Sequence, residues 1–258
     1  MKKLTPAEVE RLICATTQDE GFGSVHERIC LERLLRILQK KYNFKDVLEL
    51  RARITKGFDN LAIMDKCNIT VSDPNIEKIK KDWLYDQKPN FSNKFPDDGK
   101  YDLVWNFAMI QQHPEVIKDM IKASKKYVLI AAPNFVSLGT PFHVAWHLIT
   151  RMPCTHAEQG KVSLRTRGGL ETLAKRNGLK IVQSGYVDIP WWPDTAFGFK
   201  DIRKFLKIKE KPQEKQEIQN PDKYLAKIKS YMFLETNPFL YPLATPLFAH
   251  HTYVLARK

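Results

Sequence analysis

The chain has 258 residues, of which 43% are hydrophobic and 28% are charged. This composition is typical of a globular protein with a substantial core, and it excludes wholesale disorder. The formal net charge is +13, and a basic surface attracts nucleic acid, anionic membranes or acidic proteins. Because the lysines are spread along the chain and nucleic-acid-binding motifs are lacking, we do not expect nucleic acid to be the main partner.

The sequence carries no signal for a membrane or for export. Its apolar runs fall well short of the roughly 18 residues that a membrane helix needs, and Met1–Pro6 lacks the apolar stretch of a signal peptide. Four cysteines stand far apart, at positions 14, 30, 67 and 154, which favours buried, reduced thiols. We therefore expect a cytoplasmic protein without a transmembrane segment.

Two helices are expected first. Thr5-Pro6-Ala7-Glu8 is a capping box with proline at the first helical position, and it predicts a helix over 6–17. Ser24-Val25-His26-Glu27 has the same pattern, and apolar residues at helical spacing follow it. The second helix is therefore expected over 25–41.

Apolar strands and helices then alternate. Strands are expected at 46–50, 69–73, 101–106 and 127–132, and helices at 58–65, 75–84 and 114–123. Strands that are apolar throughout indicate a parallel sheet covered on both faces, and right-handed crossovers make it doubly wound. The fold class expected is α/β with a doubly wound, mostly parallel sheet.

The second half of the chain is less regular. Helices are expected at 141–151 and 170–177, a strand at 179–188, and a last strand at 249–257 that alternates enough to be antiparallel at an edge. We interpret 1–258 as a single domain. Its parts are N-terminal helices (1–42), an α/β core (43–188), an insertion or lid with one helix near 222–234 (189–248), and the last strand (249–258).

Four segments in this order resemble class I methyltransferases that use S-adenosylmethionine. Val47–Leu50 is similar to the first strand and the opening of the cofactor loop, and Val71–Asn75 to the second strand. Phe95–Phe107 is similar to the fourth strand with its entry and exit, and Gly169–Val182 to the late helix and sixth strand. The resemblance covers most of 25–255, excluding much of the insertion.

The resemblance implies a cofactor site where these strands end. It assigns Glu49 and Leu50 to the cofactor loop, Asp73 with Pro74 to the ribose hydroxyls, and Asn106 with Phe107 to the exit of the fourth strand. Independently of the family, ligands of open parallel sheets lie beyond the carboxyl ends of the strands. An alternative role for Asp73 is a helix N-cap before Pro74.

The cofactor loop departs from the family pattern. The family has glycines at alternate positions after the first strand, whereas this chain has Arg51, Arg53 and Thr55. A non-glycine residue at positive φ costs about 1–2 kcal/mol, so the loop must follow another path. Either Arg51 or Arg53 pairs with a carboxylate of the cofactor or of another acidic ligand, or the cofactor is no longer bound.

Candidate catalytic and metal-binding residues are few. His113, after the fourth strand, and His143 are the candidate bases; a loop position before Pro114 is the alternative for His113. His143 and His147 have helical zinc spacing, but the glutamate of H-E-x-x-H is missing, so no metal site is expected. For His250 and His251, in the last strand, packing is the interpretation.

The function expected is an S-adenosylmethionine-dependent methyltransferase acting on a small molecule or a protein side chain. The first alternative is a catalytically inactive, methyltransferase-like binding or scaffold protein, because the cofactor loop is altered. The second is an RNA-directed methyltransferase, which rests on charge alone. Aromatic residues of the insertion could form a lid or a small core, and its basic stretch at 200–215 is a candidate surface for a protein partner.

Overall fold

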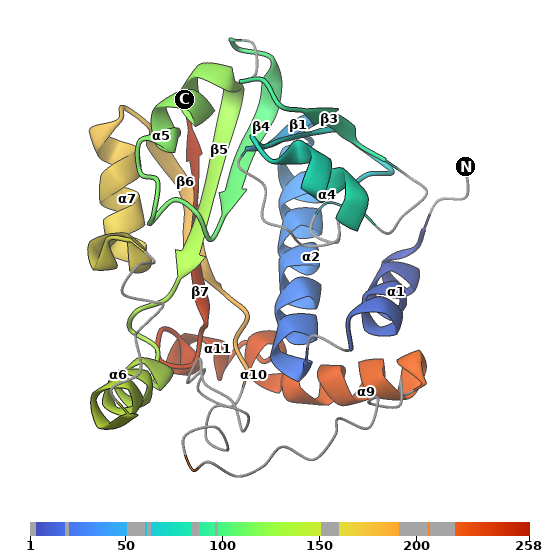
Figure 1. Ribbon diagram of the computed structural model, residues 1–258, viewed down its shortest axis with the longest axis vertical. Coiled ribbons are helices and arrows are strands. Elements are labelled where there is room, and N and C mark those ends of the chain that lie inside the picture. The colour runs from blue at the N-terminus through green and yellow to red at the C-terminus, as the bar shows by residue number, and fades with distance from the viewer. Residues whose placement is uncertain are drawn as a thin grey trace.

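A seven-stranded sheet organises the chain. The computed structural model describes residues 4–18, 21–50, 60, 63–83, 88–95, 98–150, 160–190, 206 and 220–258, without the side chains of 143, 146 and 147. The strand order is β3-β2-β1-β4-β5-β7-β6 (Figure 1). The strands β3, β2, β1, β4 and β5 are parallel, and β7 is antiparallel to both β5 and β6. The expected doubly wound, mostly parallel sheet is confirmed. The last strand is antiparallel as expected, but its expected place at an edge is wrong, because β7 lies between β5 and β6.

The expected strands are present within two or three residues of their predicted bounds. They are β1 (Asp46–Leu50), β2 (Asn68–Ser72), β4 (Tyr101–Phe107), β5 (Ser124–Pro133), β6 (Lys180–Val187) and β7 (His251–Arg257). The strand β3 (Asn90–Ser92) was not expected. Three half-buried or exposed residues are too few to produce a periodic signal.

Of the two N-terminal helices, the predicted first residue is confirmed for one and wrong for the other. In α1 (Pro6–Thr17), the Thr5 hydroxyl accepts from the Glu8 backbone N–H at 3.2 Å, and the Thr5 N–H donates to the Glu8 carboxylate at 2.7 Å. The helix α2 (Phe22–Tyr42) begins three residues earlier than expected, so Ser24 does not cap it. Its N-cap is Gly21, whose φ of 96° is accessible mainly to glycine.

The other expected helices lie close to their predicted positions, whereas the 3-10 helix at Val162–Arg165 and the short helix α11 (Tyr241–Ala244) were not expected. The expected ones are α4 (Ile76–Asp82), α5 (Val116–Ala123), α6 (Gly139–Thr150), α7 (Arg167–Arg176), α9 (Pro221–Tyr231) and α10 (Phe233–Thr236). Of the helix expected at 58–65, the structure describes Asn60, which is helical, and Ile63–Asp65, which form a turn. Among the described helices, none is long and apolar enough to cross a membrane.

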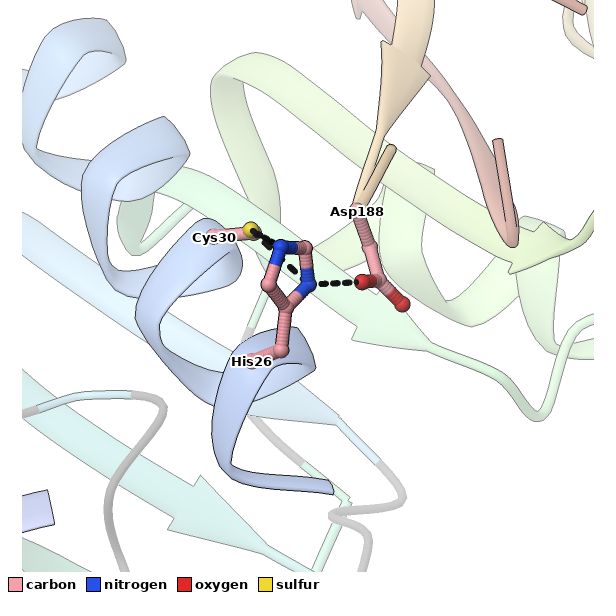
Figure 2. A group of neighbouring side chains, drawn as sticks. All are labelled: His26, Cys30 and Asp188. Atoms are coloured by element: carbon pink, nitrogen blue, oxygen red, sulfur yellow. Dashed lines mark hydrogen bonds and ion pairs between the residues drawn. The ribbon is translucent and has the colours of Figure 1, made fainter. Parts of the chain in front are cut away.

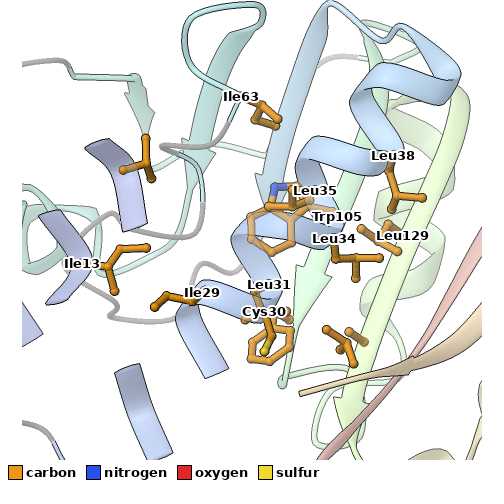
Figure 3. Packing of buried hydrophobic residues seen from close by; sticks show 14 of the residues in the cluster. Ile13, Ile29, Cys30, Leu31, Leu34, Leu35, Leu38, Ile63, Trp105 and Leu129 are labelled. Carbon is orange, nitrogen blue, oxygen red and sulfur yellow. The ribbon is translucent and has the colours of Figure 1, made fainter. Parts of the chain in front are cut away.

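Alternating side chains of the central strands build a core on each face of the sheet. Leu103, Trp105 and Phe107 of β4 join a cluster with α1, α2, α4 and α9, whereas Val104 joins a second cluster with α5 and α7. This follows from the two-residue period of a strand. Figure 3 shows Trp105 among Leu35 of α2, Leu129 of β5 and Ile63.

The helix α9 belongs to the first of these cores. Its Ile228 is fully buried in the cluster with α1 and α2. The Glu10 carboxylate of α1 accepts from Arg33 Nε of α2 at 2.7 Å and lies 3.0 Å from Lys229 Nζ of α9. One carboxylate therefore connects α9 to α1 and α2, which are far from it in the sequence. Figure 1 shows these three helices on the same side of the molecule.

Candidate functional site at the carboxyl edge of the sheet

The parallel strands bring their carboxyl ends to one edge. The strands β1, β2, β4 and β5 end there at Leu50, Ser72, Phe107 and Pro133. Because β7 is antiparallel, it begins at this edge, and its first residue, His251, pairs with Pro133 and with Val187 at the end of β6. Residues from six strands therefore meet at this edge.

Buried polar contacts join the ends of β1 and β4. The Asn106 side chain is fully buried, and its Nδ2 donates to the Leu50 carbonyl at 2.8 Å. Glu49 is also buried, and its Oε2 accepts from Asn60 Nδ2 at 2.5 Å. These contacts hold both ends of the segment 51–59, which lies outside the described residues.

Asp73 directly follows β2 at the same edge. One of its carboxylate oxygens accepts from the Asn75 N–H at 2.7 Å, which forms a tight turn through the exposed Pro74. The helix α4 begins after this turn with Asn75 as its N-cap, so Asp73 is not the N-cap of that helix. The Asp73 side chain is half-buried.

Hydrogen bonds and a close backbone approach hold the loop after β4. Ala108 adopts a φ of 57°, its N–H donates to the Ala131 carbonyl, and its own carbonyl accepts from Gln111 Nε2 at 2.9 Å. Gly160, with a φ of 90°, lies so close that a Cβ there would be 1.8 Å from the Gln111 carbonyl oxygen. His113 follows, and its Nδ1 lies 3.2 Å from Glu115 Oε1 on the surface.

Several expected site residues can now be located. Glu49, Leu50, Asp73, Pro74, Asn106 and Phe107 all lie at the carboxyl edge. Arg51, Arg53 and the side chain of His143 fall outside the described residues, so their assignments stay predictions. His113 lies at the turn before α5, beside Glu115.

A cluster that the sequence interpretation missed surrounds Asp188, directly after β6. Asp188 Oδ1 lies 2.6 Å from His26 Nδ1, and Oδ2 lies 3.2 and 3.3 Å from the Nδ1 atoms of His250 and His251. All four side chains are buried. Figure 2 shows His26 and Cys30 projecting from α2 toward Asp188.

The surrounding charges set the ionisation of the cluster. Burial alone raises the pKa of Asp188, but attraction from His250 and hydrogen bonds from the three histidines outweigh it and hold that pKa well below its usual range. Burial and the charges of Glu235 and Asp188 raise the pKa of Cys30. The protonated thiol donates to Glu235 Oε2 at 2.9 Å, and burial raises the pKa of Glu235 as well.

Two signals could have pointed to this cluster. Asp188 ends an expected strand, as Asp73 does, and an antiparallel last strand brings His251 to the same edge. The position of His26 at the start of α2 is set by packing against the sheet, which local sequence patterns do not determine.

Comparisons with known proteins agree with this architecture. No protein-family model matches the sequence, and no curated protein matches it. A "putative sarcosine dimethylglycine methyltransferase" from Galdieria sulphuraria superposes with a TM-score of 0.50 at 12% identity, over 88% of this chain and 84% of that one. Together with the strand order, this similarity shows that the chain has the class I methyltransferase fold.

Two further structures are similar over nearly the whole chain. The plantazolicin methyltransferase BpumL, in complex with SAH, has a TM-score of 0.47 and 12% identity over 98% of this chain and 91% of its own. Phosphoethanolamine N-methyltransferase 2 of Haemonchus contortus, in complex with S-adenosyl-L-methionine, has a TM-score of 0.48 and 16% identity over 96% of this chain and 60% of its own.

Proposed function

We propose that this chain is an S-adenosylmethionine-dependent methyltransferase acting on a small molecule or a protein side chain. The observation that carries the proposal is the meeting of polar side chains where the strand order reverses. The chain builds β1, β2 and β3 outward in one direction and then places β4 on the other side of β1. Ligands of doubly wound sheets bind at this switch point, and Glu49, Asp73 and Asn106 lie beside it.

The residues at this edge suit the cofactor. Asp73 offers a half-buried carboxylate at the end of β2, and a carboxylate accepts from both hydroxyls of a ribose. Asn106 and Glu49 fix the two ends of the segment 51–59, along which the cofactor would lie. The cofactor, when bound, supplies an activated methyl group.

The protein's own contribution to the reaction is mainly positioning. Transfer from a sulfonium requires the acceptor to be held in line, and oxygen or nitrogen acceptors sometimes also require a base. His113 and His143 remain the candidate bases from the sequence. The half-exposed side chain of His113 pairs through Nδ1 with Glu115 in the loop after β4. This contact would leave the other ring nitrogen, Nε2, to accept a proton.

Calorimetric titration with S-adenosylmethionine and S-adenosylhomocysteine tests the proposal. We expect micromolar binding that Asp73→Asn weakens at least about tenfold, the cost of roughly one charge-assisted hydrogen bond. Asp98→Asn is the matched control, because Asp98 is an exposed aspartate at the opposite edge, paired with Lys122.

The rewritten loop favours one alternative function. Arg51 and Arg53 stand where the family has glycines, and guanidinium groups suit an acidic ligand in place of the cofactor. If neither compound gives heat or a thermal shift up to millimolar concentration, the enzyme proposal is wrong. A binding or scaffold role on the same fold then replaces it.

A further inference from the structure

We infer that the Asp188 cluster binds a divalent transition-metal ion through Asp188, His251 and Glu27. Ligand atoms of these three residues all lie within 4.8 Å of one another. They come from the end of β6, the start of β7 and the first turns of α2, so the sheet topology assembles them. The inference does not depend on the methyltransferase proposal.

The spacing of the donor atoms suits a small ion. Zinc bonds to nitrogen and oxygen of about 2.0–2.1 Å give a tetrahedral edge of roughly 3.3 Å. Asp188 Oδ2 and His251 Nδ1 are 3.3 Å apart. The pair can therefore share one ion with little movement, and the half-buried Glu27 supplies the third ligand.

His26 positions the central carboxylate. Its Nδ1 donates to Asp188 Oδ1 at 2.6 Å from a fully buried ring, which directs Oδ2 toward His251. Metal-binding carboxylates are characteristically oriented by such a hydrogen bond on the oxygen that faces away from the metal. His250 Nδ1 lies 3.2 Å from Oδ2 and can donate to it alongside the ion.

The donor set defines the class of metal. One imidazole and two carboxylates suit Zn²⁺, Co²⁺, Mn²⁺ or Fe²⁺, and the imidazole disfavours Ca²⁺. Three protein ligands also leave a position open for water or another small ligand, as in catalytic zinc sites. His251 must then carry its proton on Nε2. The sequence analysis expected no metal site and interpreted His251 as a packing residue, so the inference departs from both expectations.

The competing description is a set of hydrogen bonds around Asp188 that binds no metal. Metal titration distinguishes it from a metal site. Untagged protein is stripped with a chelator and titrated with Zn²⁺ and Co²⁺ by calorimetry and absorption. We expect one ion per chain. His251→Gln and Glu27→Gln each remove a ligand, so each should weaken binding by at least the roughly 10–100-fold that loss of a ligand's hydrogen-bonding partner costs. His113→Gln is the matched control, since it removes an exposed histidine that also faces a glutamate.

The outcomes are distinct. Stoichiometric metal with weakened binding in both variants supports the site. The inference is wrong if the protein takes up no ion, or if Glu27→Gln, after folding is confirmed by circular dichroism, binds like the parent. Titration of the same samples with S-adenosylhomocysteine keeps the two proposals apart, because either ligand can fail to bind while the other binds.

Discussion

Single residues at the carboxyl edge adopt conformations that a chain normally avoids. Ala108 and Asp188, with φ values of 57° and 62°, directly follow β4 and β6. Each left-handed non-glycine residue costs about 1–2 kcal/mol. Strain of this kind tends to concentrate at functional sites, where surrounding contacts hold it. Here the hydrogen bonds of Gln111 to Ala108 and of His26 to Asp188 are such contacts.

The Asn106 amide is expected to support both folding and the site. In Asn106→Ala the buried Leu50 carbonyl loses its donor, so the free energy of unfolding should fall by about 1–3 kcal/mol. S-adenosylhomocysteine binding should weaken as well, because the segment after β1 is less well held. Urea unfolding and calorimetry measure the two effects.

Asn177→Ala is the comparison for this prediction. Asn177 Nδ2 also donates to a backbone carbonyl, that of Leu173, but at the end of α7. This variant should lose stability without losing affinity for the ligand. Equal losses of affinity in both variants would mean that Asn106 acts only through global stability.

Glu32 on α2 should make stability depend on pH. Burial and the negative charge of Glu10 raise the pKa of Glu32 to about 7, although the positive charge of Arg36 lowers it. The folded protein then retains a proton that the unfolded chain releases above about pH 4.5. The free energy of unfolding should therefore fall by roughly 3 kcal/mol between about pH 4.5 and 7 because of this group, and stay level above.

The difference between the parent and Glu32→Gln isolates this effect from other titrating groups. Urea unfolding from pH 4.5 to 8 should show a flatter curve for the variant. Glu77→Gln, which changes an 81% exposed glutamate paired with Lys80, should follow the parent. A Glu32→Gln curve parallel to that of the parent would show that Glu32 is ionised in the folded state.

At the scale of elements, α9 offers a test of whether it unfolds together with the α/β core. Ile228 of α9 is fully buried against α1 and α2, so Ile228→Ala should lower the free energy of unfolding by about 2–4 kcal/mol. Leu243→Ala on α11, where the side chain is 75% exposed, should change it by less than about 0.5 kcal/mol. Unfolding is followed by tryptophan fluorescence and circular dichroism.

The shape of that unfolding curve decides the prediction of a single domain. One cooperative transition, shifted by Ile228→Ala, is expected if α9 folds with the α/β core. Two separate transitions, with only the first shifted, would instead make the region around α9 an independent unit.

Elements were predicted well where local chemistry decides them. The capping box at Thr5 and the apolar runs of β1, β4 and β5 determine their structures without help from distant residues. The start of α2 was misplaced because Ser24 has a capping pattern while Gly21 can take a positive φ, and packing of Phe22 with Tyr224 and Tyr231 favours the earlier start. Propensity is a weak prior when tertiary contacts oppose it.

The candidate site was predictable only in part, for the same reason. Glu49, Asp73 and Asn106 end strands, and strand ends share an edge whatever the details of packing. The Asp188 cluster depends on a contact between His26 and Asp188, which are 162 positions apart. Its assembly requires the direction of β7 and the placement of α2, which no local pattern contains.

At the scale of the whole molecule, the net charge of +13 and the strand order suggest different ligands. Charge attracts RNA to a surface by releasing counterions, so such affinity falls about 100-fold or more between about 50 and 200 mM salt. The affinity of a ligand held in a crevice by hydrogen bonds is far less sensitive to salt.

We expect binding of an unstructured RNA to vanish over this range while S-adenosylhomocysteine affinity changes less than about twofold. Fluorescence anisotropy and calorimetry measure the two. RNA affinity that persists at the higher salt would favour the RNA-directed methyltransferase instead, because contacts beyond charge would then be recognising the RNA.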